Sequence, residues 1–372
     1  MTDLRRRGAA AVEGGETVPL LGPTVDPAAA DRARLPRLAR HSITLDDGHE
    51  VGISICGEGI PLVVVHGFTA EGILYAQALR RLVDFGFKVV AVDTAGHGGT
   101  QGLPTGGGSF TSYAELLGRV LELLGVRKSV LLGHSMGGRL VTEHAARHTA
   151  QAIAVVPVNG VIGRQWDQLM WLSRVFPPTL VAIAAILVAD TLSTAPVFRD
   201  QRQAMKLGRL VFPTLVGHLR RPWRLLGPAI SLIRSRGSGW MLDALRDGQV
   251  PVFVIHSELD FVVPFATAKS AAKRADGDLV VVERATHSWL LKDPETLPAI
   301  IEQLLDNGLG QAIARAKKAA GLDADASPAD VDRCPEFYDQ DGLALALTPP
   351  DDPGRQTLLD RAPRYRWRVR RR

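Results

Sequence analysis

Short apolar runs that alternate with helical segments constrain the fold of this chain most strongly. Four such runs lie between residues 61 and 158, with the sequences PLVVVHG, KVVAVD, SVLLG and AIAVVPV. Each is too short for a helix and is rich in valine, leucine or isoleucine, as in strands that are buried on both faces. Because strands that alternate with helices build βαβ units, we predict an α/β fold with a mostly parallel central sheet flanked by helices.

The alternation is interrupted once, after residue 160, and then resumes. The interrupting segment has apolar helical patches broken by six prolines, and the strand pattern returns with PVFVIH and DLVVVE. We interpret the interruption as a helical cap inserted into one core. The predicted segments are a loosely ordered N-terminal arm (1–41), the core (42–160 and 249–306), the helical cap (161–248) and an irregular basic C-terminal tail (307–372).

Composition and charge exclude several classes of protein. With 372 residues and 46% hydrophobic residues, the chain can bury a sizeable core and is not disordered throughout. Its two cysteines, Cys56 and Cys334, form no CxxC motif, and its histidines lack the spacing of metal ligands, so we expect no metal and no organic cofactor. Seven arginines and no acid lie within 361–372, so the formal net charge of +5 is partly a property of the tail, and we do not expect nucleic acid as a partner.

The sequence has no apolar segment long enough to cross a membrane. The longest uninterrupted apolar run, Leu180 to Ala189, rises only ~15 Å as a helix, about half of a bilayer core. The basic N-terminal run is not followed by the apolar region of a secretory signal. We therefore expect a cytoplasmic protein, with peripheral membrane contact as the alternative.

The strongest chemical signal is Gly133-His134-Ser135-Met136-Gly137, a G-x-S-x-G motif between a predicted buried strand and a predicted helix. This context is the one that the motif requires, because the serine must be held out at a sharp, strained turn. Glycines two positions before and after it let neighbouring backbones pass closely. The motif therefore predicts that Ser135 is a nucleophile.

At this point the sequence resembles the α/β-hydrolase superfamily, over roughly residues 42–306. Five segments carry the resemblance, in the order in which they occur in the family: HGF, DTAGHGGT, GHSMGG, IHSELDFVVP and ATHSWLLKDP. The resemblance implies the α/β-hydrolase fold with an inserted helical cap, and an enzyme of the esterase or lipase kind. These segments are specific for fold and catalytic residues and say little about the substrate.

The resemblance also implies a base and an acid for Ser135. A serine hydroxyl needs a base within hydrogen-bond reach, and His287 lies on the loop where the family carries it. Asp260, in the segment HSELDFVVP, matches the acid that orients this histidine, and Glu258 is the competing candidate. The predicted catalytic residues are therefore Ser135, Asp260 and His287.

Acyl transfer also needs hydrogen-bond donors for the developing oxyanion. We expect one from the backbone N–H of Met136, which follows the nucleophile, and the resemblance implies a second from the backbone N–H of Phe68. His66 is expected to orient the loop of Phe68.

The predicted cap is both aromatic and basic, with 12 Lys and Arg against five Asp and no Glu. One interpretation is that its apolar residues only pack on the core. The other is that its inner face binds an apolar acyl group, with Trp166, Trp171 and Phe176 as substrate-binding candidates. In that case the basic cap and tail contact a membrane surface peripherally.

From these observations we expect a serine hydrolase that cleaves an ester or thioester with a hydrophobic acyl group through an acyl-enzyme. The partner is then a small-molecule or lipid acyl substrate. The alternatives are an acyltransferase or a C–C bond hydrolase with the same catalytic residues, or a non-catalytic binding protein on the hydrolase fold. Acyl length, oligomeric state and the order of the two termini are not predicted.

Overall fold

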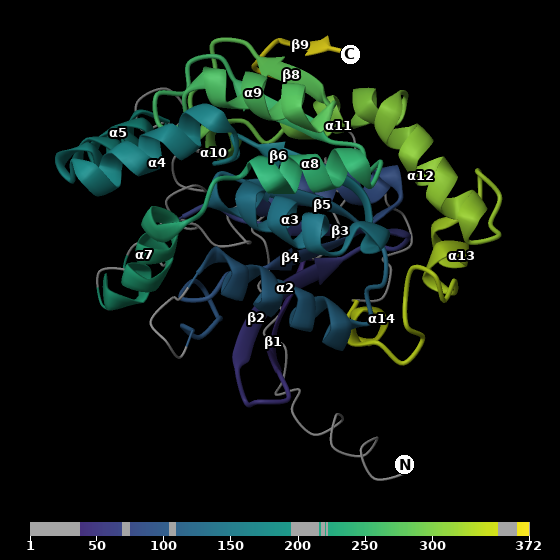
Figure 1. Ribbon diagram of the computed structural model, residues 1–372. Coiled ribbons are helices and arrows are strands. Elements are labelled where there is room, and N and C mark those ends of the chain that lie inside the picture. The colour runs from purple at the N-terminus through teal and green to yellow at the C-terminus, as the bar shows by residue number, and fades with distance from the viewer. Residues whose placement is uncertain are drawn as a thin grey trace, which may run out of the picture.

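The computed structural model describes residues 38–68, 75–103, 109–194, 216, 220, 222–348 and 363–371, so the predicted N-terminal arm falls almost wholly outside it. Nine strands form one sheet in the order β1-β2-β4-β3-β5-β6-β7-β8-β9 (Figure 1). The strands are β1 (Ala39–Thr44), β2 (Glu50–Cys56), β3 (Ile60–Val65), β4 (Phe87–Val92), β5 (Ser129–His134), β6 (Ala152–Val158), β7 (Phe253–Ser257), β8 (Asp278–Val282) and β9 (Trp367–Arg370).

The sheet is mostly parallel, as predicted. Strands β3 to β8 pair in parallel, whereas β1, β2 and β9 pair antiparallel at the two ends of the sheet. Every residue of β3, β4 and β5 is buried, which explains why these strands occur as continuous apolar runs rather than alternating patterns. Strands β1 and β2 are adjacent in the chain and pair antiparallel, and Gly48 takes a positive φ of 83° in the turn between them.

Helices cover both faces of the sheet. One layer, on the near side in Figure 1, contains α2 (Phe110–Leu124), α3 (Met136–Arg147), α8 (Gly239–Asp247) and α9 (Phe265–Ala275). The other contains α1 (Ala76–Leu82), α11 (Thr296–Leu305) and α12 (Gly308–Ala319). Because both faces are covered, the parallel strands lie in a continuous hydrophobic core.

The predicted cap boundary at residue 248 is wrong. Helix α8 packs against α3 and α9, and its Leu242 and Leu245 belong to the main core. The parallel strands β6 and β7 need a crossover helix between them, and α8 supplies it. The helical insertion therefore ends before α8 and contains α4 (Arg164–Val175), α5 (Pro178–Thr194), the 3₁₀-helix η5 (Pro222–Leu225) and α7 (Leu226–Arg234).

The C-terminal segment is not the irregular tail that we predicted. After α12 it forms α13 (Pro328–Asp332) and α14 (Leu343–Ala346), with Phe337 and Tyr338 fully buried between them. The Tyr338 hydroxyl donates a hydrogen bond of 2.8 Å to the carbonyl of Gly59, just before β3 begins. This segment therefore covers the edge of the sheet where the parallel strands start.

The arginine-rich C-terminal end forms β9, which pairs with β8. Tyr365, Trp367 and Val369 alternate along it and pack against the core. Arg368, between them, forms ion pairs with Glu258 at 3.0 Å and with Glu283. The pattern RYRWRVRRR thus has the period of two that marks a strand, and its arginines conceal that period.

In the part of the chain that the structure describes, no helix combines the length and the apolar character that a membrane span requires.

We predict that Tyr338→Ala lowers the free energy of unfolding by about 3–5 kcal/mol, because it removes a buried aromatic side chain. Tyr338→Phe should cost only about 1 kcal/mol, because it removes one hydrogen bond and keeps the ring. Urea unfolding followed by circular dichroism measures both. An unchanged unfolding midpoint in Tyr338→Ala would show that the C-terminal segment is not part of the cooperative core.

Candidate active site

The turn that carries Ser135 is strained, as the motif predicts. Ser135 lies between β5 and α3 with φ 53° and ψ −116°. A Cβ atom on Gly133 would lie 2.3 Å from the carbonyl oxygen of Gly137, and one on Gly137 would lie 2.2 Å from that of Val65. The two glycines are therefore required by close backbone approaches, and the turn presents the serine hydroxyl at the end of β5.

The structure brings the three predicted catalytic side chains together. Ser135 follows β5, Asp260 follows β7 and His287 follows β8, so all three lie where parallel strands end. His287 Nε2 is 3.0 Å from Ser135 Oγ, and His287 Nδ1 is 2.8 Å from Asp260 Oδ2. Because the carboxylate only accepts hydrogen bonds, Nδ1 carries a proton and Nε2 can accept the proton of Ser135.

Asp260, and not Glu258, is the carboxylate that is hydrogen-bonded to His287. The other oxygen of Asp260 accepts the backbone N–H groups of Val262 and Val263, at 2.9 and 2.7 Å. The side chain of Glu258 pairs instead with Arg368 in β9. The competing candidate, Glu258, therefore forms an ion pair with β9 instead of a contact with His287.

Burial and charge have opposite effects on the pKa values of His287 and Asp260. Burial lowers the pKa of His287, but the charge and hydrogen bond of Asp260 and the charge of Asp190 outweigh it and raise that pKa above its ordinary value. Burial raises the pKa of Asp260, but His287, the nearby His256 and the Val263 N–H group outweigh it and lower that pKa. The arrangement thus favours an ionised acid and stabilises the imidazolium that proton transfer produces.

Asn159, which the sequence analysis missed, orients the acid. It follows β6, takes a positive φ of 48°, and its Nδ2 donates to Asp260 Oδ2 at 2.5 Å. Its Oδ1 accepts the indole N–H of Trp289 at 3.2 Å. The available signal was a polar residue directly after a buried strand, at the edge where Ser135 lies.

The backbone of His287 is fixed on both sides. Asp190, from helix α5 of the insertion, accepts the N–H of His287 at 3.1 Å and the N–H of Ser288 at 2.8 Å, one with each carboxylate oxygen. On the other side, His134 Nε2 donates to the carbonyl of His287 at 3.2 Å. Two residues from different segments therefore position the candidate base.

His134 can perform this task because it is held neutral. Burial and the nearby His287 lower its pKa to about 3. Since Nε2 donates to a carbonyl, Nδ1 is the acceptor, and the hydroxyl of Tyr75 donates to it at 2.9 Å. His134, the residue before Ser135, therefore holds the backbone of His287 by a hydrogen bond.

The loop after β3 approaches Ser135, as an oxyanion site requires. A Cβ atom on Gly67 would lie 3.2 Å from Cβ of Ser135, so Phe68 follows a residue in close contact with the nucleophile. His66 donates from Nδ1 to the carbonyl of Gly67 at 2.8 Å and accepts the N–H of Thr94 at Nε2, at 2.9 Å. These contacts agree with the predicted role of His66.

The second predicted donor belongs to α3. Met136 is the first residue of this helix, and the first N–H groups of a helix have no partner within it. The positive end of the helix dipole lies at the same place. The backbone N–H groups of Phe68 and Met136 are therefore the candidate oxyanion donors.

The three aromatic side chains predicted to bind substrate, those of Trp166, Trp171 and Phe176, differ in their burial. Trp166 is fully buried and packs in a small cluster with Val161, Met170, Val262 and Val263. Trp171 and Phe176 are 62% and 57% exposed. Trp166 therefore does not share a surface with Trp171 and Phe176, and a role of the three residues in binding substrate stays a prediction.

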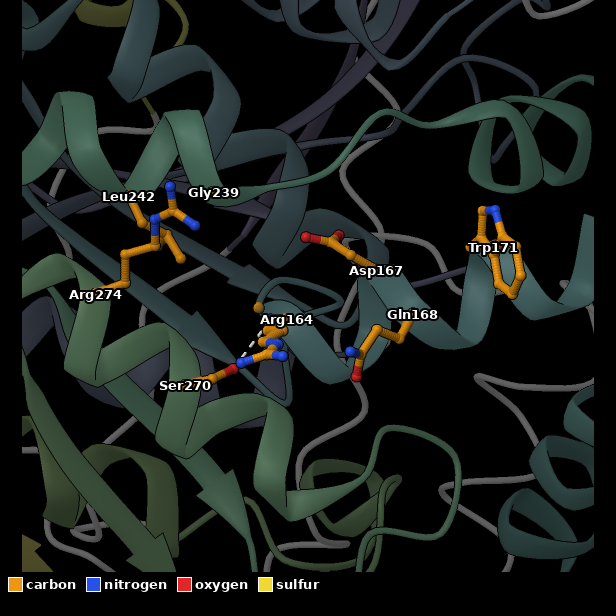
Figure 2. A pocket seen from close by; sticks show the side chains of 9 residues that line it. Arg164, Asp167, Gln168, Trp171, Gly239, Leu242, Ser270 and Arg274 are labelled. Atoms are coloured by element: carbon orange, nitrogen blue, oxygen red, sulfur yellow. Dashed lines mark hydrogen bonds between the residues drawn. The ribbon is translucent and has the colours of Figure 1, made fainter.

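The structure has a separate pocket of about 300 Å³ between α4, α8 and α9, to which Trp171 belongs. Figure 2 shows Arg164 and Asp167 on one side of it and Ser270 and Arg274 on the other. Neither Ser135 nor His287 lines this pocket, so it is distinct from the candidate active site. Among the described residues, no group of three or more His, Cys, Asp or Glu side chains could hold a metal ion.

We predict that Asp190→Asn shifts the acidic limb of the pH profile of kcat/KM to lower pH. The charged groups around His287 are Asp260 and Asp190, with the neutral His134 and His256 nearby, and loss of one negative charge lowers the pKa of the imidazole. The plateau should also fall by about ten- to a hundredfold, because the base is less well positioned. Asp243→Asn, a half-buried carboxylate on α8 paired with Arg274, is the control. If the acidic limb of the pH profile does not move in Asp190→Asn, the charge of Asp190 does not affect the pKa of His287 and its role is structural.

The chain is similar to known proteins over most of its length. A model of the alpha/beta hydrolase family matches residues 62–299. A putative non-heme haloperoxidase of Mycobacterium phage D29 is 30% identical over 268 residues, which cover 71% of this chain and 94% of that protein. A non-heme chloroperoxidase of Streptomyces lividans is 29% identical, over 69% of this chain and 96% of that protein.

Solved structures share the fold at lower identity. A carboxylesterase of Nitrososphaera gargenis matches with a TM-score of 0.57 and 21% identity, over 71% of this chain and 97% of that one. The esterase RhEst1 of Rhodococcus sp. ECU1013 matches with a TM-score of 0.55 and 22% identity, over 72% and 98%. The family match, the relatives and the arrangement of the sheet lead to one conclusion: the chain belongs to the alpha/beta hydrolase family of enzymes.

Proposed function

We propose that this protein is a serine hydrolase that cleaves a carboxylic ester or thioester through an acyl-enzyme on Ser135. The observation that supports the proposal most strongly is the continuous contact from Ser135 Oγ to His287 Nε2 (3.0 Å) and from His287 Nδ1 to Asp260 (2.8 Å). A base in contact with the nucleophile, itself oriented by an acid, is the arrangement that activates a serine hydroxyl.

In the proposed reaction, Ser135 Oγ attacks the substrate carbonyl while its proton passes to His287 Nε2. Asp260 stabilises the resulting imidazolium, and the N–H groups of Phe68 and Met136 receive the developing oxyanion. The proton then passes to the leaving alcohol or thiol, and the acyl group stays on Ser135. Water, deprotonated by His287, releases the acid and restores the serine.

A hydrophobic acyl group fits the chemistry of the insertion. Helix α5, which reaches His287 through Asp190, has no other ionisable side chain in its sequence PTLVAIAAILVADTLST. Since Asp190 is already engaged with the loop of His287, the described part of this helix offers apolar atoms to a substrate. Transfer of an apolar acyl chain from water to such a surface is favourable.

The names of the relatives favour a second candidate activity, in which hydrogen peroxide replaces water. Proteins similar to this chain over most of their length are named non-heme haloperoxidases. Attack of peroxide on the acyl-enzyme would release a peroxy acid and restore the hydroxyl of Ser135. The peroxy acid would then oxidise a halide ion to the hypohalous acid and become the carboxylate.

We predict that Ser135→Ala lowers the turnover of p-nitrophenyl esters by about 10⁴-fold or more, because no other group replaces the nucleophile. Ser129→Ala, at the start of β5, is the matched control and should retain activity. A series from acetate to decanoate should show kcat/KM rising with chain length. Full turnover by Ser135→Ala would refute the proposal, and a preference for acetate would refute the hydrophobic acyl group.

The same two variants test the second candidate. Bromination of monochlorodimedone with acetate, peroxide and bromide should be lost in Ser135→Ala and kept in Ser129→Ala. Equal bromination by both variants would show that it does not proceed through Ser135, and no bromination by the wild type would leave hydrolysis as the activity.

A further inference from the structure

Helix α5 is apolar, yet several of its side chains are exposed to solvent. Apolar residues occur on all sides of it, and such a helix is normally buried in a protein or a membrane. Its ionisable residue, Asp190, is buried against the loop of His287. In contrast, Val181 and Val188 are 70% and 58% exposed, and Ile186 is exposed as well.

The end of helix α4 continues the apolar surface. Trp171, Val175 and Phe176 are all exposed, and α4 packs beside α5 at one end of the molecule (Figure 1). We name this surface the α4–α5 face and define it by Trp171, Val175, Phe176, Val181 and Val188. These exposed apolar side chains lie on two helices that pack against each other, and large exposed apolar patches usually mark a site of contact with a partner or a membrane.

Among the described residues of the insertion, the exposed charged side chains all have one sign. Among the described residues of the insertion, the acidic ones are Asp167 and Asp190. Asp167 accepts hydrogen bonds from Ser238, and Asp190 accepts them from the loop of His287. Arg174 projects from α4 itself, and its described hydrogen bonds go to the carbonyl groups of Ile233 and Ser235 rather than to an acid. Exposed arginines occur at 164, 174, 220, 234 and 236.

We propose that the α4–α5 face docks on the surface of an anionic lipid bilayer, with α4 and α5 lying along the interface. The apolar side chains leave water, Trp171 lies at the level of the headgroups, and the arginines contact lipid phosphates. Each arginine near an anionic surface adds an attraction that weakens with salt.

A second copy of the chain fits this face less well. An isologous contact through it would bring two sets of arginines together, and neither described acid of the insertion, Asp167 or Asp190, is exposed to pair with them. Like charges at such an interface disfavour association, whereas anionic headgroups neutralise them. The charge of the face therefore favours lipid as its occupant.

The test is co-sedimentation of the full chain with vesicles. The wild type should bind vesicles of phosphatidylcholine with 40% phosphatidylglycerol and bind pure phosphatidylcholine vesicles less. Val181→Asp combined with Val188→Asp should lower binding to the anionic vesicles at least tenfold, because two charges would enter the apolar region. Both residues are exposed, so we expect the circular dichroism spectrum to be unchanged.

Trp171→Ser and Trp240→Ser form a matched pair. Trp240 is also exposed but lies on α8, outside the α4–α5 face. We expect weaker vesicle binding for Trp171→Ser and unchanged binding for Trp240→Ser. Vesicle binding that is absent in the wild type, or that is equal in the folded double variant, would overturn it. So would a wild-type dimer that the double variant converts to a monomer, since the face would then bind a second copy.

Discussion

The whole site depends on the fixed position of one imidazole ring. His287 contacts Ser135 through Nε2 and Asp260 through Nδ1, while its backbone is bound by Asp190 on one side and His134 on the other. These groups come from four different segments, and three of them follow parallel strands. A parallel sheet brings them together because the ends of its strands lie at one edge, where loops can meet.

Burial makes these contacts effective. Ser135 is 8% and His287 2% exposed, so water competes little for their hydrogen bonds. The same burial would make an unpaired carboxylate costly. Asp260 meets this requirement with Asn159, His287 and two backbone N–H groups, and Asp190 with two backbone N–H groups. Each buried acid is therefore also a fixed constraint on the geometry around it.

Helix α5 joins two environments in one element. Its inner side holds Asp190 against the loop of His287, and its outer side presents Val181 and Val188 to the surroundings. A contact on the outer side therefore acts on the element that positions the candidate base. At the opposite edge of the sheet, the C-terminal segment covers the strand starts and leaves the edge with Ser135 to the loops and the insertion.

Local signals in the sequence explain what could be predicted. Buried strands, the glycines around Ser135 and the segment with His287 can each be recognised from a few neighbouring residues. The core and the side chains of Ser135, Asp260 and His287 could therefore be predicted from the sequence. The role of Asp190 could not be predicted, because this residue ends an apolar run and its partners, His287 and Ser288, lie 97 and 98 residues away in the sequence. The strand β9 was hidden by its arginines, and α8 was assigned to the cap because a proline-rich segment precedes it. In each case the missing information was a contact between distant segments.

The most direct test of the account is the rate at which a fluorophosphonate labels Ser135, measured by peptide mass spectrometry across pH. We predict one adduct, on the peptide that contains Ser135, formed at a rate that rises with pH as His287 loses its proton and that falls sharply in His287→Ala. Labelling that is absent from this peptide, or equally fast without His287, would contradict the central claim that this imidazole activates this serine.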